Sequence, residues 1–383
     1  MDTLQRLKHL SSQMDIEPAE DVACPKLGNS PSQKGEKITL SQAVLPNGKR
    51  INLLKSLLNS ACERNCYYCP FRAGRDFRRA TFSPDEFARV FMSLHRAGLV
   101  QGMFLSSGVV AGGMRTQDKL LATAEILRHK MGYRGYIHLK IMPGAERDQV
   151  VQAMRLADRV SINLEAPTTE RLRLLAPGKQ FLEELYQPLR WVEELRQTLP
   201  ASSGWNNRLP SSTTQFVVGG AGESDLELMS TSQALYRQLH LGRVYYSAFS
   251  PVPDTPLEDH PPASPRREHR LYQASFLLRD YGFDTEDLPF DREGNLPQET
   301  DPKLAWAMTH LAERPVEINF APRQELLRIP GIGPTGVGRI LSIRRKDRIT
   351  DISALHKLGI NASRAAPYIL INGKRPAFQT ALF

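Results

Sequence analysis

Short apolar runs alternate with longer amphipathic segments along the middle of the chain. The apolar runs have the length and composition of buried strands, and the segments between them have the period of a helix. Strands separated by helices in this way pair in parallel through right-handed crossovers. We predict strands at residues 100–105, 136–141, 160–164, 213–218 and 244–249, and helices at 83–98, 118–130, 146–156, 181–195 and 224–239.

A further strand just before the cysteine-rich segment brings the array to about six βα units. Such an array can curl into a partial barrel or stay an open doubly wound sheet, and periodicity alone does not decide between them. The first helix of the array has a clear start: Ser83 can cap it, Pro84 suits its first position and Glu86 completes a capping box. Gly98 marks its end.

The flanks of the array are more polar. Residues 1–36 are interpreted as an N-terminal extension, and a turn at 46–48 leads toward the first strand. After the array, residues 251–265 are rich in proline and form a loop, and helices are predicted at 266–279 and 303–311.

Composition is that of a globular protein, since 41% of the residues are apolar and 24% are charged. No apolar run has membrane-spanning length and no secretory signal is visible, so we expect a cytoplasmic protein without a membrane partner. The formal net charge is +9, and residues 321–383 hold 11 Lys and Arg against 3 Asp and Glu, a net of +8. A basic terminal module on a nearly neutral body is typical of phosphate-backbone binding, although a solvated surface explains the charge equally well.

Three of the four cysteines lie within eight residues, at Cys62, Cys66 and Cys69. Three thiolates on one loop can bind three irons of a cubane cluster and leave the fourth iron open for a small molecule. A structural zinc site would need a fourth Cys or His nearby, and a redox disulfide between Cys66 and Cys69 would leave Cys62 unexplained. The remote Cys24 is either a fourth cluster ligand or a buried small hydrophobe.

The CxxxCxxC spacing, with Tyr68 before its last cysteine and a strand before the loop, resembles the radical S-adenosylmethionine (radical SAM) superfamily. The resemblance implies a partial (β/α)6 barrel of TIM-barrel type, a [4Fe–4S] cluster on the three cysteines, and S-adenosylmethionine bound to the open iron. It further implies that one electron breaks the sulfonium C–S bond of this cofactor, giving methionine and a 5′-deoxyadenosyl radical, which takes a hydrogen atom from the substrate. A flavodoxin or ferredoxin is the kind of electron donor expected.

The ends of the predicted strands supply the cofactor contacts that the resemblance implies. Family members place a Gly-Gly-Glu-type turn after the second strand, but this chain lacks the Glu, so backbone groups or serine hydroxyls take its role. An equal alternative for Asn163 is a turn residue whose side chain makes local hydrogen bonds. For Gly220 and Glu223 the alternative is a plain connection between a strand and a helix, without cofactor binding. No catalytic acid, base or hydrogen donor can be named. The expected cofactor contacts are Tyr68, Ser106, Ser107, Gly108, Asn163, Glu165, Gly220, Glu223 and Phe249.

A second motif lies in the basic C-terminal region, where apolar residues at helical spacing flank the sequence Pro-Gly-Ile-Gly at 330–333. The glycines allow a tight turn that approaches a phosphate closely, and the next helix directs its N–H groups at the same point. This resembles the helix-hairpin-helix motif of DNA-binding and repair proteins, which grips the backbone without reading sequence. The expected nucleic-acid contacts are Gly331, Ile332, Gly333, Thr335, Gly336, Arg339, Arg344, Arg345 and Lys346.

A degenerate second copy at 355–360 lacks the Gly-Ile-Gly core, and a structural hairpin or a protein-docking module is the alternative to DNA binding. The two motifs together resemble radical SAM proteins described as DNA modification or repair enzymes from their domain architecture. We therefore predict an α/β partial (β/α)6 barrel with a small all-α helix-hairpin-helix domain. The expected segments are an extension at 1–47, the barrel at 48–290, a connection at 291–315 and the nucleic-acid-binding domain at 316–383.

The predicted function is a radical SAM enzyme that modifies or repairs DNA. Double-stranded DNA is preferred over RNA because backbone-binding hairpins of this kind usually meet duplex DNA. One alternative is a radical SAM enzyme that acts on RNA or a small molecule, with the C-terminal domain used for docking. The other is a DNA-binding iron–sulfur protein whose cluster is structural or senses redox state.

Overall fold

The computed structural model describes residues 2–18, 38, 40–44, 48 and 50–378. The chain divides into two compact units, the first over Met1–Glu223 and Ala234–Glu268 and the second over Ser224–Gln233 and His269–Phe383. The division therefore falls earlier in the chain than the predicted end of the barrel. Within the described ranges, no helix is long and apolar enough to cross a membrane.

The first unit is built on one seven-stranded sheet whose strands follow one another in chain order. β1 pairs with β2 in antiparallel fashion, and every later pair is parallel. The strands are β1 (Leu40–Val44), β2 (Arg50–Leu57), β3 (Gly102–Ser106), β4 (Tyr136–Lys140), β5 (Arg159–Ser161), β6 (Ser211–Val218) and β7 (Arg243–Ala248).

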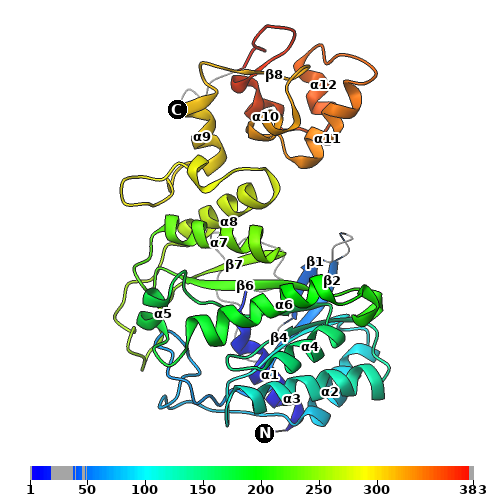
Figure 1. Ribbon diagram of the computed structural model, residues 1–383, viewed down its shortest axis with the longest axis vertical. Coiled ribbons are helices and arrows are strands. Elements are labelled where there is room, and N and C mark those ends of the chain that lie inside the picture. Colours follow the sequence, from blue (N-terminus) through cyan, green and yellow to red (C-terminus); the bar gives the residue numbers. More distant parts are fainter. Residues whose placement is uncertain (1, 19–37, 39, 45–47, 49, 379–383) are drawn as a thin grey trace. The chain divides into compact units, whose positions relative to one another are not determined.

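Helices connect the parallel strands, and Figure 1 shows α2, α3, α4 and α6 on the same side of the sheet. A consecutive strand order keeps every right-handed crossover on one face, so the sheet curls into a half-barrel rather than a doubly wound sheet. The elements are α2 (Pro84–Arg96), α3 (Gly113–Glu125) with a π-helical end (Ile126–Lys130), α4 (Arg147–Leu156), α5 (Thr169–Leu175), a π-helical turn (Phe181–Tyr186), α6 (Gln187–Thr198) and α7 (Asp225–Leu239). The first part of α7 belongs to the second unit, as does most of α8 (Pro265–Asp280), which follows β7.

The start of α2 confirms the predicted capping box. Ser83 Oγ accepts from the Glu86 amide at 3.3 Å, and Glu86 Oε2 accepts from the Ser83 amide at 3.0 Å. Gly98 follows the helix with a left-handed φ of 72°. The N-terminal extension also contains a helix that the sequence did not predict, α1 (Thr3–Ser12), which packs against β2. The predicted turn residues 46 and 47 lie outside the described residues, as does Cys24.

The second unit contains short helices and one pair of parallel strands. The all-α prediction for this region was wrong, because β8 and β9 pair at the two ends of the module. Strands of two residues have no alternating pattern that could be read from the sequence. The elements are α9 (Pro302–His310), β8 (Val316–Glu317), α10 (Arg323–Arg328), α11 (Pro334–Ile343), α12 (Ile352–Lys357), α13 (Ala362–Ala365) and β9 (Ile369–Leu370).

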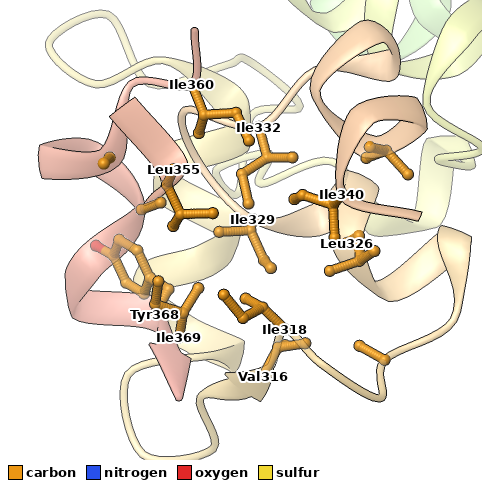
Figure 2. Close-up of a cluster of buried hydrophobic side chains, with 14 of the residues drawn as sticks. Val316, Ile318, Leu326, Ile329, Ile332, Ile340, Leu355, Ile360, Tyr368 and Ile369 are labelled. Carbon is orange, nitrogen blue, oxygen red and sulfur yellow. The ribbon is translucent and has the colours of Figure 1, made fainter. Parts of the chain in front are cut away.

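Two helix–turn–helix pairs, α10 with α11 and α12 with α13, share one apolar core in this unit. Figure 2 shows Ile329, Ile332, Ile340, Leu355 and Ile360 converging from both pairs, and all five are at most 5% exposed. The turns between the helices both use a left-handed glycine, Gly331 with φ 81° and Gly359 with φ 67°. The region at 355–360 therefore has the turn expected of a second copy, although its sequence lacks the Gly-Ile-Gly core.

The ammonium group of Lys303 lies against the first turn, where it donates to the Ile332 carbonyl at 2.6 Å. Burial lowers the pKa of Lys303 to about 7. An unfolded lysine keeps its proton up to about pH 10.4, so the unfolded chain binds more protons than the folded chain between these values. The Lys303 contribution to the free energy of unfolding should therefore rise as the pH is raised from about 7 to about 10.

Urea denaturation of the wild type and of Lys303→Met across this pH range measures the effect. The difference in unfolding free energy between the two proteins should move in favour of the wild type as the pH rises. A difference that stays constant over the whole range would show that Lys303 is charged in the folded state throughout.

Candidate active site

One cavity in the first unit collects the three clustered cysteines at the carboxyl ends of the parallel strands. Parallel α/β folds build their active sites at this edge. Six of the nine predicted cofactor contacts line the same cavity, namely Tyr68, Ser106, Ser107, Gly108, Asn163 and Glu165.

Backbone contacts hold the cysteine loop in place. The Glu63 amide donates to Val109 O at 2.8 Å, and the Tyr67 amide donates to Leu175 O at 2.7 Å, so the loop is tied to the ends of β3 and α5. Gly108 packs so closely on this loop that a Cβ there would overlap the Ala61 carbonyl. Glycine is thus required at 108 by the approach of two backbones.

Two of the three thiols accept hydrogen bonds from the backbone. Backbone amides donate to two of them, Val109 N to Cys62 Sγ and Phe71 N to Cys69 Sγ, both at 3.4 Å. Burial raises the pKa of the Cys66 thiol and of the Cys69 thiol when no metal is bound, and the Phe71 amide only partly offsets this at Cys69. Across the described residues, no three His, Cys, Asp or Glu side chains could hold a single metal ion. The described residues therefore supply no fourth ligand for a tetrahedral zinc site beside the three thiols.

A buried ion pair lies beside the cysteines. Lys179 Nζ contacts Glu165 Oε1 at 2.9 Å, and the two side chains are 9% and 6% exposed. Burial alone would lower the pKa of Lys179, but the negative charges of Cys66 and Glu165 outweigh it and raise this pKa. Burial, followed by the charge of Glu165, also raises the pKa of Tyr68. Lys179 therefore brings a fixed positive charge to the thiols.

Glu165 is unusual in both its backbone and its carboxylate. Its φ of 65° is left-handed, a conformation that costs a non-glycine residue free energy and tends to persist at functional sites. Its Oε2 atom is buried and accepts no hydrogen bond from the described residues. A buried carboxylate oxygen without a donor, facing a cavity, is the group that a bound ligand would satisfy.

In the second unit, the residues predicted to contact nucleic acid differ in their exposure to solvent. Thr335, Arg345 and Lys346 are exposed, whereas Ile332 is 1% exposed and belongs to the core. The Ile332 side chain therefore cannot touch a nucleic acid, and its amide already donates within the turn to Ile329 O.

Two of the predicted arginines have structural contacts. Arg339 Nη1 donates to Leu358 O at 2.6 Å, and Arg344 Nη1 donates to Ala321 O at 2.6 Å and to Ile318 O at 3.2 Å. Arg344 thus ties the end of α11 to the segment before α10. Its role in binding nucleic acid stays a prediction, with part of its guanidinium already engaged.

Comparison with known proteins identifies the domain that contains the cysteine loop. Residues 57–235 match the profile of the Radical SAM superfamily. The chain carries a radical SAM domain. It is an enzyme whose cofactors are a [4Fe–4S] cluster and S-adenosylmethionine. No curated protein matches the chain significantly.

Solved structures similar to the chain include two of the [FeFe]-hydrogenase maturase HydG. One is 10% identical with a TM-score of 0.45, and covers 59% of this chain and 49% of that one. The HydG of Carboxydothermus hydrogenoformans is 16% identical with a TM-score of 0.45, at 59% and 51% coverage. The methylornithine synthase PylB is 16% identical with a TM-score of 0.47, at 59% and 62% coverage. The match thus spans about half to three fifths of these proteins.

The cavity of the radical SAM domain fits both cofactors. The three cysteines can hold the cluster, and the free Oε2 of Glu165 can accept from an amino or hydroxyl group of S-adenosylmethionine. When bound, the cluster supplies the electron that starts radical chemistry. The chain itself supplies the enclosing walls, the cation of Lys179 and the hydroxyls of Ser106 and Ser107.

Three predicted cofactor contacts, Gly220, Glu223 and Phe249, are not among the residues that line this cavity. The Glu223 carboxylate accepts from the backbone amides of Gly219 and Ala221, so it stabilises its own turn. A Cβ at Gly220 would press on Leu175 and Phe249. These contacts give the turn a structural role, and cofactor binding by the three residues stays a prediction.

Sequence reasoning missed four charged residues that line the cavity, Glu17, Arg64, Lys140 and Lys179. Lys140 could have been predicted from the sequence, because it shares one face of β4 with His138. Two polar residues on one face of an otherwise apolar strand indicate a functional site. Glu17 and Lys179 lie in segments without a helical or strand pattern of apolar residues, so nothing in the local sequence indicates that their side chains face the cavity.

Replacing Lys179 with Met should lower the unfolding free energy by about 3–5 kcal/mol, because Glu165 is left as an unpaired buried charge. Urea denaturation of the metal-free protein measures this. The matched control is Arg190→Met in the exposed pair with Glu194, where both side chains are about half exposed and the cost should be at most about 0.5 kcal/mol. An equal loss of unfolding free energy in the two variants would contradict the burial of the Lys179–Glu165 pair.

Proposed function

We propose that this radical SAM enzyme acts on nucleic acid, with duplex DNA as its substrate, and modifies or repairs it after hydrogen abstraction. The observation that carries the proposal is the left-handed Gly331 turn at the start of α11, with exposed cations near the end of the same helix. A turn and helix start of this kind expose backbone N–H groups to an anion.

Several features of the second unit support phosphate binding. The N–H groups of Thr335 and Gly336 lie in the first turn of α11, where they have no partner within the helix. Arg345 and Lys346 are exposed just beyond its last residue. The net charge of +8 over residues 321–383 favours a polyanion over a neutral or acidic protein partner. All of these contacts address the backbone, so we expect binding without sequence preference.

The radical SAM cavity would act on a base or sugar that reaches it from outside the stack. A base within a duplex must therefore be flipped out, or the target must already be unpaired. The electron would come from a small donor such as flavodoxin or ferredoxin.

The double variant Arg345→Gln/Lys346→Gln tests the interface. If both cations contact phosphates, the slope of log affinity against log salt for a duplex DNA should fall by roughly 2, with weaker binding of all sequences alike. Fluorescence anisotropy with a labelled duplex at several salt concentrations measures this.

The control removes two exposed charges from the first unit, Lys119→Gln/Arg190→Gln, and should leave the slope almost unchanged. Equal losses in the two double variants would mean that net charge alone drives binding. If the wild type binds duplex RNA more tightly than duplex DNA, RNA is favoured as the substrate.

A further inference from the structure

Glu17 reaches the active-site cavity from outside the βα array. It follows α1 and the short 3-10 turn Gln13–Ile16, and it lines the cavity together with the cysteines. Both of its carboxylate oxygens are bound: Lys140 Nζ contacts each of them at 3.0 Å, and Asn163 Nδ2 contacts them at 3.3 and 3.4 Å. One carboxylate is thus held by two side chains from different parts of the sheet.

A second lysine faces the same residue. Lys55 Nζ donates to the Glu17 carbonyl at 2.7 Å. Lys55 lies two residues before Leu57, which lines the cavity, so the two side chains share the concave face of β2. Lys55, Lys140 and Asn163 are 4%, 6% and 8% exposed.

A barrel interior is ordinarily filled by branched apolar side chains. Here, two lysines and an amide occupy it, although removing ammonium groups from water costs several kcal/mol unless an anion receives them. The anion is provided by a residue that belongs to none of the strands or crossover helices. The lysines and Asn163 therefore form a preorganised binding site for an oxyanion. The same donors suit the Glu17 carboxylate and an oxyanion of a bound ligand.

We propose that Lys140 and Asn163, with Lys55 beside them, bind an anionic group of the substrate, a phosphate or a carboxylate, and that the Glu17 carboxylate occupies this site in the structure. The inference rests on the cavity being the site of the radical SAM reaction. It does not depend on the C-terminal unit binding DNA. For a nucleic-acid substrate the group would be a backbone phosphate of the target nucleotide, and for a small molecule it would be a phosphate or carboxylate.

The test uses the full-length, anaerobically reconstituted protein and two probes, inorganic phosphate and acetate, in isothermal titration calorimetry. Glu17→Ala should bind one of these anions at least about tenfold more tightly than the wild type, where the carboxylate fills the site. Adding Lys140→Gln to Glu17→Ala should weaken this binding at least about tenfold. Preference for phosphate or for acetate shows whether the site takes a phosphate or a carboxylate.

Binding of neither anion by Glu17→Ala, or binding that Lys140→Gln leaves unchanged, overturns the proposal. If Glu17→Ala does not fold, Glu17→Gln replaces it, and urea midpoints are compared in sodium phosphate, sodium acetate and sodium chloride of equal ionic strength. A midpoint raised by phosphate or acetate and lowered again by Lys140→Gln supports the site, whereas equal midpoints in all three salts contradict it. DNA binding by the same variants is measured separately, so failure of the anion site remains distinct from failure of the DNA assignment.

Discussion

Replacing any one of Cys62, Cys66 and Cys69 with Ala should reduce 5′-deoxyadenosine formation to the level of iron-free protein. Each thiol is expected to bind a different iron, so the loss of one opens a second position on the cluster and makes it labile. Bound iron and sulfide per chain, measured after anaerobic reconstitution, should fall together with the activity. The three variants should behave alike, because all three thiols line the same cavity.

Cys24→Ala is the matched control, since it removes the remaining cysteine of the chain. It should keep both the iron content and the activity. Loss of iron in this variant would instead make Cys24 a fourth cluster ligand, and the cofactor would then have no open iron to bind.

Replacing Gly331 with Ala should lower the unfolding free energy of the second unit by at least about 2 kcal/mol. A left-handed backbone costs an alanine about 1–2 kcal/mol, and here the added Cβ would also overlap the Asn361 carbonyl oxygen. The turn would have to move away from α13, so affinity for duplex DNA should fall in the same variant. Urea denaturation and anisotropy measure the two effects.

Gly338→Ala is the control within the same helix. Outside the backbone of its own helix, no described atom lies within 4 Å of a Cβ at this position, and the residue is in the interior of α11. The change should stabilise the protein by about 0.5–1 kcal/mol through helix propensity. Destabilisation by both substitutions to a similar degree would contradict the role assigned to the Gly331 turn.

Local patterns were sufficient to predict most of the first unit. The alternation of apolar runs and amphipathic segments gave the order of β3 to β7 and their helices, because each signal lies within one element. The Ser83 capping box is equally local, with its two partners three residues apart. The choice between a half-barrel and a doubly wound sheet needed the strand order, which depends on contacts between distant segments.

The parts of the site that could not be predicted depend on contacts between residues far apart in sequence. Glu17 meets Lys140 across 123 positions, and no local pattern points either residue at the other. The cysteines could be predicted because three ligands on one loop share a short spacing. Glu223 shows the converse, since a glycine-rich turn that suggests a ligand can also use its carboxylate to stabilise itself.

We propose that the radical chemistry of the first unit is directed at DNA. Its most direct test is to quantify 5′-deoxyadenosine formed by the reconstituted, reduced enzyme with S-adenosylmethionine, in the presence and absence of duplex DNA. We expect formation that rises when DNA is added, and less of a rise in Arg345→Gln/Lys346→Gln. Formation that DNA leaves unchanged would contradict the DNA assignment, and no formation by an enzyme with a fully loaded cluster would contradict the radical reaction itself.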